Sequence, residues 1–176
     1  METNPFGVLG LPERFDLEDE AIESAYLGLA AAAHPDRYSD PLEQADAAER
    51  ASAINAAREA LLNPESRARA LFGIREGTEG GAGGDENALP ADFLMEVMEV
   101  RERLEEAVAS EEPGELAALR RWADETRSEH LATLGRQFEA GEKVGVIRQE
   151  LNALRYIQRM LDQMPPPTSP PTTSRP

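Results

Sequence analysis

The residue types best suited to chemistry lie together in one short segment, His34-Pro35-Asp36-Arg37-Tyr38. Because proline has no amide hydrogen and a nearly fixed φ angle, Pro35 turns the chain rigidly and presents the His34 imidazole and the Asp36 carboxylate together. Such a rigid tip is suited to docking on another molecule. Taken alone, however, the tripeptide favours a structural turn in which Asp36 accepts hydrogen bonds from backbone amides and His34 ends a helix.

Few other residues suggest a catalytic or metal centre. The chain has two histidines and no cysteine, which excludes disulfides, a thiol nucleophile and a thiolate zinc site. His130 precedes the apolar pair Leu131 and Leu134, outside any constellation of carboxylates or thiols, and this indicates a structural role. The glutamate-rich stretches are typical of a solvated helix face. We therefore expect no enzymatic activity, no metal and no cofactor; the enzyme-class alternative is a metal-dependent hydrolase that uses His34, Asp36 and surface carboxylates.

The composition restricts the class of partner. Among 176 residues, 34 acidic side chains outnumber 18 basic ones, for a net charge of −16. A nucleic-acid partner is nearly excluded, because each phosphate contact would begin from repulsion. The first residues lack the basic start of a secretory signal, and no apolar run approaches the roughly 20 residues that a membrane span requires. We therefore expect a soluble, cytoplasmic protein that binds neither nucleic acid nor membranes.

Apolar spacing predicts a helical hairpin around the tip. A helix over residues 18–33 ends before Pro35, because proline disfavours helical geometry in the residue that precedes it. A second helix over residues 42–62 stops at Asn63-Pro64, which also opens a short third helix that ends at Gly73. The aligned positions are Ile22, Tyr26, Leu29 and Ala33 on the first helix, and Ala47, Ala51, Ile54, Arg58 and Leu61 on the second.

Three longer helical patterns follow in the second half of the chain. Their apolar stripes are Phe93, Val97, Val100, Leu104 and Val108; then Leu116, Leu119, Ala123, Thr126, Leu131, Leu134 and Phe138; and finally Val144, Ile147, Leu151, Leu154 and Leu161. Short loops near Pro113-Gly114 and Gly141-Glu142 predict a small antiparallel three-helix bundle. No stretch alternates with the period of a strand, so the predicted fold class is all-α.

Shifts in composition divide the chain into four parts. Residues 1–76 form the N-terminal helical unit, and residues 91–164 form the bundle. Between them, residues 77–90 are too rich in glycine and too poor in apolar side chains to fold, which predicts a flexible linker. Residues 165–176 contain too much proline to sustain a helix, which predicts a disordered tail.

The first helix of the bundle carries more apolar side chains than one buried face requires. Beside the predicted core positions, Leu94, Met95 and Met98 make this helix apolar nearly all the way round for two turns. We expect these three side chains to be exposed unless a partner covers them, and methionine is adaptable at such surfaces. The alternative is that the linker or the N-terminal unit covers them as an interdomain core.

The surroundings of the tripeptide resemble a J-domain. His34-Pro35-Asp36 matches the J-domain signature, and Phe6-Gly7-Val8-Leu9-Gly10-Leu11-Pro12 is similar to the opening of these domains. Ile54-Asn55, together with Arg67 after Asn63-Pro64, resembles the third and fourth helices. Phe93-Leu94-Met95-Glu96 followed by Glu99-Val100-Arg101-Glu102 is similar to the first bundle helix of the HscB family, the J-type co-chaperones of iron–sulfur cluster assembly. The resemblance extends over about residues 4–164.

This resemblance implies an adaptor with two binding ends rather than an enzyme. In the family, the J-domain binds a DnaK-type or HscA-type chaperone and stimulates its ATPase, while the bundle binds the iron–sulfur scaffold IscU. The matching chaperone-binding positions are His34, Pro35, Asp36 and Arg37. The matching scaffold-binding positions are Leu94, Met95, Met98, Glu99, Arg101, Glu102, Glu106 and Tyr156. The alternative is a J-domain adaptor for a different client, with the bundle as an oligomerisation module.

Three features depart from the family pattern. The helix before the signature usually carries basic residues that meet an acidic patch on the chaperone, but residues 15–36 contain none here. Electrostatic attraction to the chaperone is therefore weak, or it comes from Arg14 and Arg37, or the chaperone itself carries a different charge. Arg58 and Ala70 stand where the family tends to place aromatic residues, which predicts a thinner core in the first unit. In the client site, Met98 and Tyr156 replace the more usual Leu and Phe.

Overall fold

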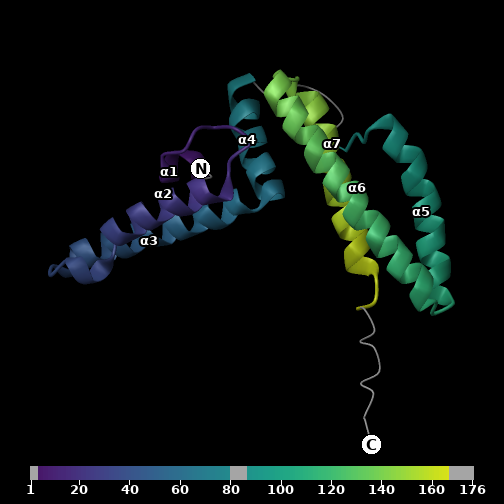
Figure 1. Cartoon of the computed structure of the whole chain (residues 1–176), viewed down its shortest axis with the longest axis horizontal. Coiled ribbons are helices and arrows are strands. Elements are labelled where there is room, and N and C mark those ends of the chain that lie inside the picture. The colour runs from purple at the N-terminus through teal and green to yellow at the C-terminus, as the bar shows by residue number, and fades with distance from the viewer. Residues whose placement is uncertain (1–3, 80–86, 167–176) are drawn as a thin grey trace, which may run out of the picture. The chain divides into compact units, whose positions relative to one another are not determined.

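The computed structural model describes residues 4–79 and 87–166, and all regular structure within those ranges is helical (Figure 1). The all-α prediction is therefore confirmed. The described residues form two compact units: the first comprises residues 4–79 and 134–147, and the second comprises residues 87–133 and 148–166. The predicted domain boundaries stay a prediction, because part of the expected linker, residues 80–86, and most of the expected tail lie outside the described residues.

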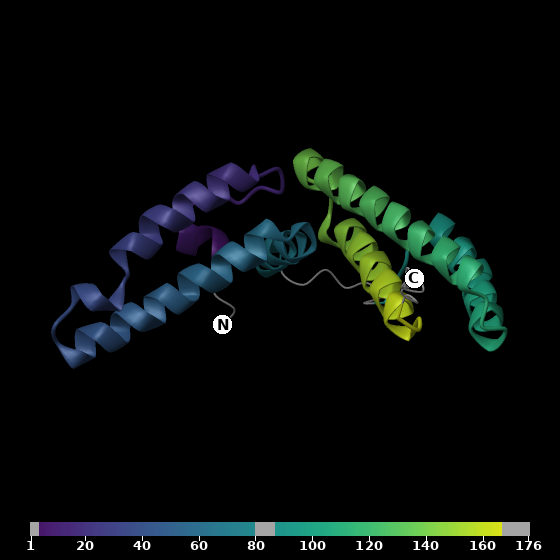
Figure 2. The same ribbon diagram turned by 60° about the horizontal axis from the view of Figure 1, so that its bottom comes forward.

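The first unit contains the predicted helical hairpin. Helix α2 (Asp19–Ala32) and helix α3 (Pro41–Leu62) are joined by a turn that contains the short 3-10 helix η1 (Pro35–Arg37). This turn forms the end of the hairpin far from α4 (Figures 1 and 2). The short helix α1 (Pro5–Leu9) packs against α2 and α3, and α4 (Pro64–Glu79) packs against α3.

An Asx-Pro dipeptide begins three of these helices. At Asn4-Pro5, Asp40-Pro41 and Asn63-Pro64, the Asn or Asp side chain accepts hydrogen bonds from amides of the first turn, and proline follows at the first helical position. Proline belongs there because the amide hydrogen that it lacks has no helical partner at that position. These local signals explain why the predicted and observed starts of α3 and α4 agree within one residue.

The predicted end of α4 is wrong. The sequence predicts a stop at Gly73, whereas α4 continues to Glu79 and includes three residues of the expected linker. A glycine stops a helix when it takes the left-handed conformation of a C-cap, as Gly141 does after α6 with a φ of 69°. Gly73 has no positive φ. Half-buried residues that follow it, such as Ile74, favour continuation.

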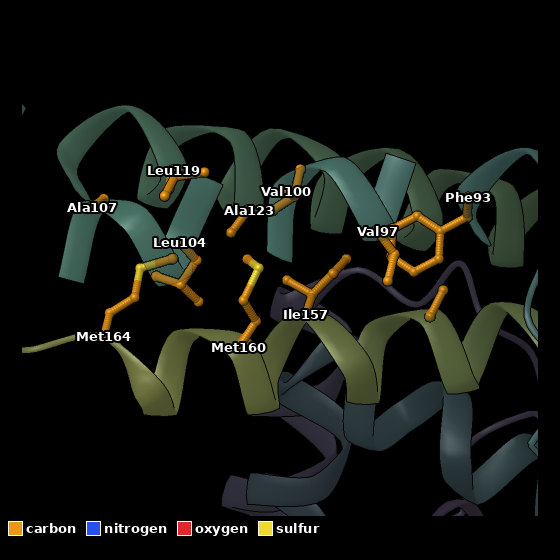
Figure 3. Close-up of a cluster of buried hydrophobic side chains, with 11 residues drawn as sticks. Phe93, Val97, Val100, Leu104, Ala107, Leu119, Ala123, Ile157, Met160 and Met164 are labelled. Atoms are coloured by element: carbon orange, nitrogen blue, oxygen red, sulfur yellow. The ribbon is translucent and has the colours of Figure 1, made fainter. Parts of the chain in front are cut away.

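The second unit contains the three predicted bundle helices. They are α5 (Ala91–Ala109), α6 (Pro113–Ala140) and α7 (Val144–Gln163), although the end of α6 and the start of α7 are assigned to the first unit. Side chains from α5, α6 and α7 meet in one apolar core (Figure 3). Its members include Phe93, Val97, Val100, Leu104, Leu119, Ala123, Ile157 and Met160.

The bundle core differs from the predicted stripes at the end of α5. Val108 is 43% exposed, and Ala107 is buried in its place. The reason is that the core positions continue from Leu104 by a step of three rather than four, which keeps Ala107 on the face centred on Val100. On α7, Ile157 and Met160 are buried, as is Met164 just beyond the end of this helix, whereas Leu161 is only half-buried.

A buried arginine joins the chain segments of the first unit. The Arg67 guanidinium donates to the carbonyl oxygens of Leu61 at 2.7 Å, Phe15 at 2.9 Å and Leu17 at 2.9 Å. It also lies 3.5 Å from a carboxylate oxygen of Asp19. Burial lowers the pKa of Arg67, an effect that the nearby acidic side chains oppose. One side chain therefore ties the start of α4 to the end of α3 and to the segment before α2.

We predict that Arg67→Ala lowers the free energy of unfolding of the first unit by about 3 kcal/mol, because it leaves three carbonyls without their donor. Arg67→Lys should recover only part of the lost free energy, since a lysine ammonium cannot donate in the planar geometry of the guanidinium. Chemical denaturation followed by circular dichroism measures the change. The control is Arg14→Ala, which removes a solvent-exposed ion pair with Asp16 and should cost less than about 1 kcal/mol. Equal losses for the two variants would contradict the role of Arg67.

Candidate functional site

The turn between α2 and α3 places the signature side chains in solvent. The His34 and Asp36 side chains are 61% and 89% exposed, with Nδ1 of His34 3.7 Å from a carboxylate oxygen of Asp36. The backbone amide of Asp36 donates to Nδ1 of His34 at 3.3 Å, so the neutral imidazole carries its hydrogen on Nε2. The Arg37 guanidinium donates to the Ala31 carbonyl at 3.2 Å and fastens the turn to the last turn of α2.

This arrangement is suited to binding a partner. Among residues 4–79 and 87–166, no group of three His, Asp or Glu side chains could hold a metal ion. The imidazole and carboxylate at the tip are exposed, whereas catalytic groups act from sites that exclude water. Within the turn, Nδ1 of His34 accepts from a backbone amide, a role that the structural-turn interpretation gave to Asp36. A locally fixed and exposed tip presents a defined shape to a partner.

An ion pair joins the two helices of the hairpin at Arg58, one of the two positions where a thinner core was expected. Arg58 of α3 donates through two nitrogens to the carboxylate of Glu23 on α2, with Nε 2.8 Å from one oxygen. The guanidinium carbon also lies 4.9 Å from the ring centre of Tyr26. Arg58 thus links the two helices where the family tends to have an aromatic side chain. The hydrogen bond with Arg58 lowers the pKa of Glu23, and burial opposes this effect in part.

The second core position that departs from the family pattern, Ala70, borders a cavity. Ala70, expected to thin the core, lines a cavity of about 800 Å³ that α1, α3 and α4 surround, together with small residues such as Ala53, Ala56 and Gly73.

The acidic character of α2 also remains, because it has no basic residue. Asp19 and Glu23 are paired with Arg67 and Arg58, while Glu20 is exposed.

On the bundle, the three surplus apolar side chains of α5 are exposed, as predicted. Leu94 is 51% exposed, Met95 78% and Met98 64%. Their neighbours Phe93 and Val97 are buried in the core (Figure 3). Glu99, Arg101, Glu102 and Glu106, the other predicted client-binding residues of α5, are exposed as well.

The predicted client-binding residues divide between two sides of α5. Glu96 accepts a hydrogen bond from the Trp122 indole at 2.6 Å, and Arg103 donates to Glu115 at 2.9 Å, so this side faces α6. Helical spacing places Glu99 and Glu106 next to that side. Leu94, Met98 and Arg101 repeat by steps of four and three on the opposite side, which faces α7.

Tyr156, the predicted client-binding residue of α7, is only partly exposed. It is half-buried and packs on the bundle core, with its ring edge-to-face with Phe93 at 6.1 Å between centroids. It also lines a groove with Arg101. The structure therefore brings Tyr156 and Arg101 together but leaves Glu99 and Glu106 on the far side of α5.

A histidine–carboxylate pair escaped the sequence analysis. Nδ1 of His130 on α6 lies 2.6 Å from a carboxylate oxygen of Glu150 on α7, and both side chains are nearly buried. Phe93 of α5 contacts the imidazole edge-to-face at 4.8 Å. The pair joins three helices, which supports the structural role expected for His130. Its two members are 20 residues apart, so no local pattern could have indicated it.

Comparison with known proteins accounts for both halves of the chain. Residues 4–70 match the family model described as DnaJ domain, and residues 89–164 match the one described as HSCB C-terminal oligomerisation domain. A co-chaperone protein HscB homolog of Burkholderia thailandensis is 32% identical over 162 residues, which cover 91% of each chain. The homolog of Bordetella petrii is 38% identical over 149 residues, covering 79% of this chain and 85% of the relative.

Solved structures have the same architecture. The chaperone HscB from Vibrio cholerae superposes with a TM-score of 0.68 at 26% identity, covering 91% of this chain and 94% of that one. Human co-chaperone protein HscB superposes with a TM-score of 0.73 at 21% identity, covering 92% and 80%, and shows likeness of fold. No helix in the described part of the chain is long and apolar enough to cross a membrane.

We predict a pH-dependent contribution from the Glu23–Arg58 pair. Because the pKa of folded Glu23 lies below its ordinary value of 4.5, the pair stabilises the hairpin above that value. The contribution is lost as the pH falls through the lowered pKa. Glu23→Gln should therefore lower the Tm at neutral pH, and the difference from wild type should shrink below about pH 4.

The exposed Glu20→Gln change on the same helix is the matched control for thermal melts across this pH range. A Tm difference for Glu23→Gln that stays constant with pH would contradict the assigned ion pair.

Proposed function

The chain belongs to the HscB family of J-domain co-chaperones, and from this we propose that its two units bind two different proteins. The α2–α3 tip binds a DnaK-type or HscA-type chaperone and stimulates its ATPase. The outer surface of α5 binds the iron–sulfur scaffold protein IscU and delivers it to that chaperone. The protein itself catalyses no reaction in this proposal and assists iron–sulfur cluster assembly in the cytoplasm.

The exposed, locally fixed tip supports the first half of the proposal. His34, Asp36 and Arg37 are exposed, and one hydrogen bond within the turn and one to α2 hold the turn. A rigid surface that binds one arrangement of a chaperone better than the others shifts the population toward that arrangement. If the selected arrangement hydrolyses ATP faster, the tip accelerates hydrolysis without touching the nucleotide.

The exposed apolar surface of α5 carries the second half. Leu94, Met95 and Met98 remain more than half exposed although the bundle core lies on the other face of the same helix. Exposed apolar side chains at adjacent positions are typical of a protein interaction site. Glu99 and Glu102, four residues after Met95 and Met98, add exposed carboxylates beside it.

A second candidate function is oligomerisation of the bundle. It is favoured by the description of the family model that matches residues 89–164, which names an oligomerisation domain. The same apolar surface would then face another copy of the chain. Sedimentation velocity separates the two possibilities, because an oligomer that Leu94→Ala and Met98→Ala dissociate would place the surface between copies.

We predict that His34→Gln and Asp36→Asn each reduce stimulated ATP turnover to the basal rate of the chaperone. Both side chains are exposed, so the helix content should not change. Single-turnover hydrolysis by a DnaK-type chaperone from the same organism measures the effect. Asp46→Asn, an identical chemical change at an exposed position of α3, is the control and should stimulate fully. Full stimulation by the His34 variant would refute the role of the tip.

We further predict that Leu94→Ala with Met98→Ala weakens scaffold binding by about 2 kcal/mol or more, as for central apolar anchors of an interface. Stimulation of the ATPase in the absence of scaffold should not change. Isothermal titration calorimetry gives the affinity, with the 78% exposed Leu42 changed to Ala as control. Wild-type affinity in the double variant would exclude α5 as the client site.

A further inference from the structure

A groove between α5 and α7 extends the exposed apolar surface of α5. It encloses about 520 Å³, and its lining includes Arg101, Glu105 and Val108 from α5 and Tyr156, Arg159 and Met160 from α7. Arg101 and Tyr156 are among the client-binding residues expected from the family resemblance. Glu105, Val108, Arg159 and Met160 are not. The groove therefore begins inside the proposed client site and continues beyond it.

Helical spacing makes the two surfaces one continuous stripe. Leu94, Met98, Arg101, Glu105 and Val108 follow one another by steps of four, three, four and three, so they lie along the α7 side of α5. The stripe is apolar at both ends, at Leu94 and Met98 and again at Val108. The charged Arg101 and Glu105 between them are joined by an ion pair of 3.0 Å along the helix.

The far end of this stripe has an apolar floor. Val108 is 43% exposed because Ala107 occupies the core position. Beside it, the buried side chains of Leu104 and Met160 line the groove. An apolar side chain of a partner would bury its own surface there and that of Val108, at about 25 cal/mol per Å².

The charge of the groove differs in sign from that of the chain. Its charged lining consists of Arg101, Glu105 and Arg159, one more cation than anion, in a protein of net charge −16. Because Arg101 already pairs with Glu105, the exposed Arg159 is the cation placed to meet a partner. An acidic side chain complements it.

A stable interface also needs a larger buried area than Leu94, Met95 and Met98 supply. A specific protein–protein interface buries roughly 800 Å² on each partner. The exposed Leu94, Met95 and Met98 span little more than one helical turn. The groove on the same side of α5, lined by Leu104, Val108 and Met160, supplies further apolar surface.

We propose that this groove is a second docking element for the same client. It takes a segment of the scaffold protein that places an apolar side chain against Val108 and Met160 and a carboxylate near Arg159. The inference rests on the proposed scaffold-binding function and adds Val108 and Arg159 as determinants of specificity. Leu94 and Met98 anchor one part of the client, and the groove selects for the other part.

The test is calorimetric titration of the full chain with the iron–sulfur scaffold protein from the same organism. Val108→Asp should weaken binding about tenfold or more, because it places a charge in the apolar end of the groove. Arg159→Glu should weaken it further than Arg159→Ala, and Arg159→Lys should stay within about threefold of wild type. Val146→Asp, at a 38% exposed valine of α7 that does not line the groove, is the matched control and should bind normally.

Wild-type affinity in Val108→Asp and Arg159→Glu, with binding lost in the Leu94/Met98 double variant, would overturn the groove and leave the proposed function standing. No binding by wild type, or full binding by the double variant, would overturn the proposed function and the groove assignment with it. A dimer that Val108→Asp dissociates, without any effect on scaffold affinity, would instead assign the groove to self-association and overturn the proposal. Circular dichroism of each variant checks that the helices are intact.

Discussion

Helix α5 can bury only one face in a bundle of three helices, and the surface proposed to bind the client depends on this constraint. The buried face consists of Phe93, Val97, Val100, Leu104 and Ala107. Every other apolar side chain of α5 must stay in contact with water or with another protein. Leu94, Met95 and Met98 at one end and Val108 at the other are the result. Their exposure follows from helix geometry and does not require a special conformation.

The J-domain unit achieves the opposite result, an exposed polar tip, by placing its stabilising contacts away from the tip. Arg67 satisfies three carbonyls at the base of the hairpin, and Arg58 joins Glu23 along its length. The tip itself is held by the last turn of α2 and by hydrogen bonds within the turn. The signature side chains therefore need not contribute to the core, and they remain available to a partner.

The two surfaces also differ in what they offer electrostatically. Helix α2 has no basic residue, and two of its carboxylates are already paired with arginines of α3 and α4. The groove on the bundle, by contrast, has an exposed Arg159 above an apolar floor. Charge complementarity affects mainly association rate and specificity, whereas buried apolar anchors supply affinity. In the proposed binding of the chaperone, selectivity then depends chiefly on the shape of the tip.

The sequence by itself determined the helices, the exposed tip and the surplus apolar side chains of α5. Periodicity, prolines and Asx caps act within a few residues of one another, so the starts of α3 and α4 and the exposure of Leu94 could be predicted. Only the tertiary structure decided the Glu23–Arg58 and His130–Glu150 pairs, the burial of Ala107 in place of Val108, and the continuation of α4 past Gly73. Each of these depends on which helix packs against which and in what rotation. That arrangement minimises the free energy of the whole fold, and no local pattern of residues encodes it.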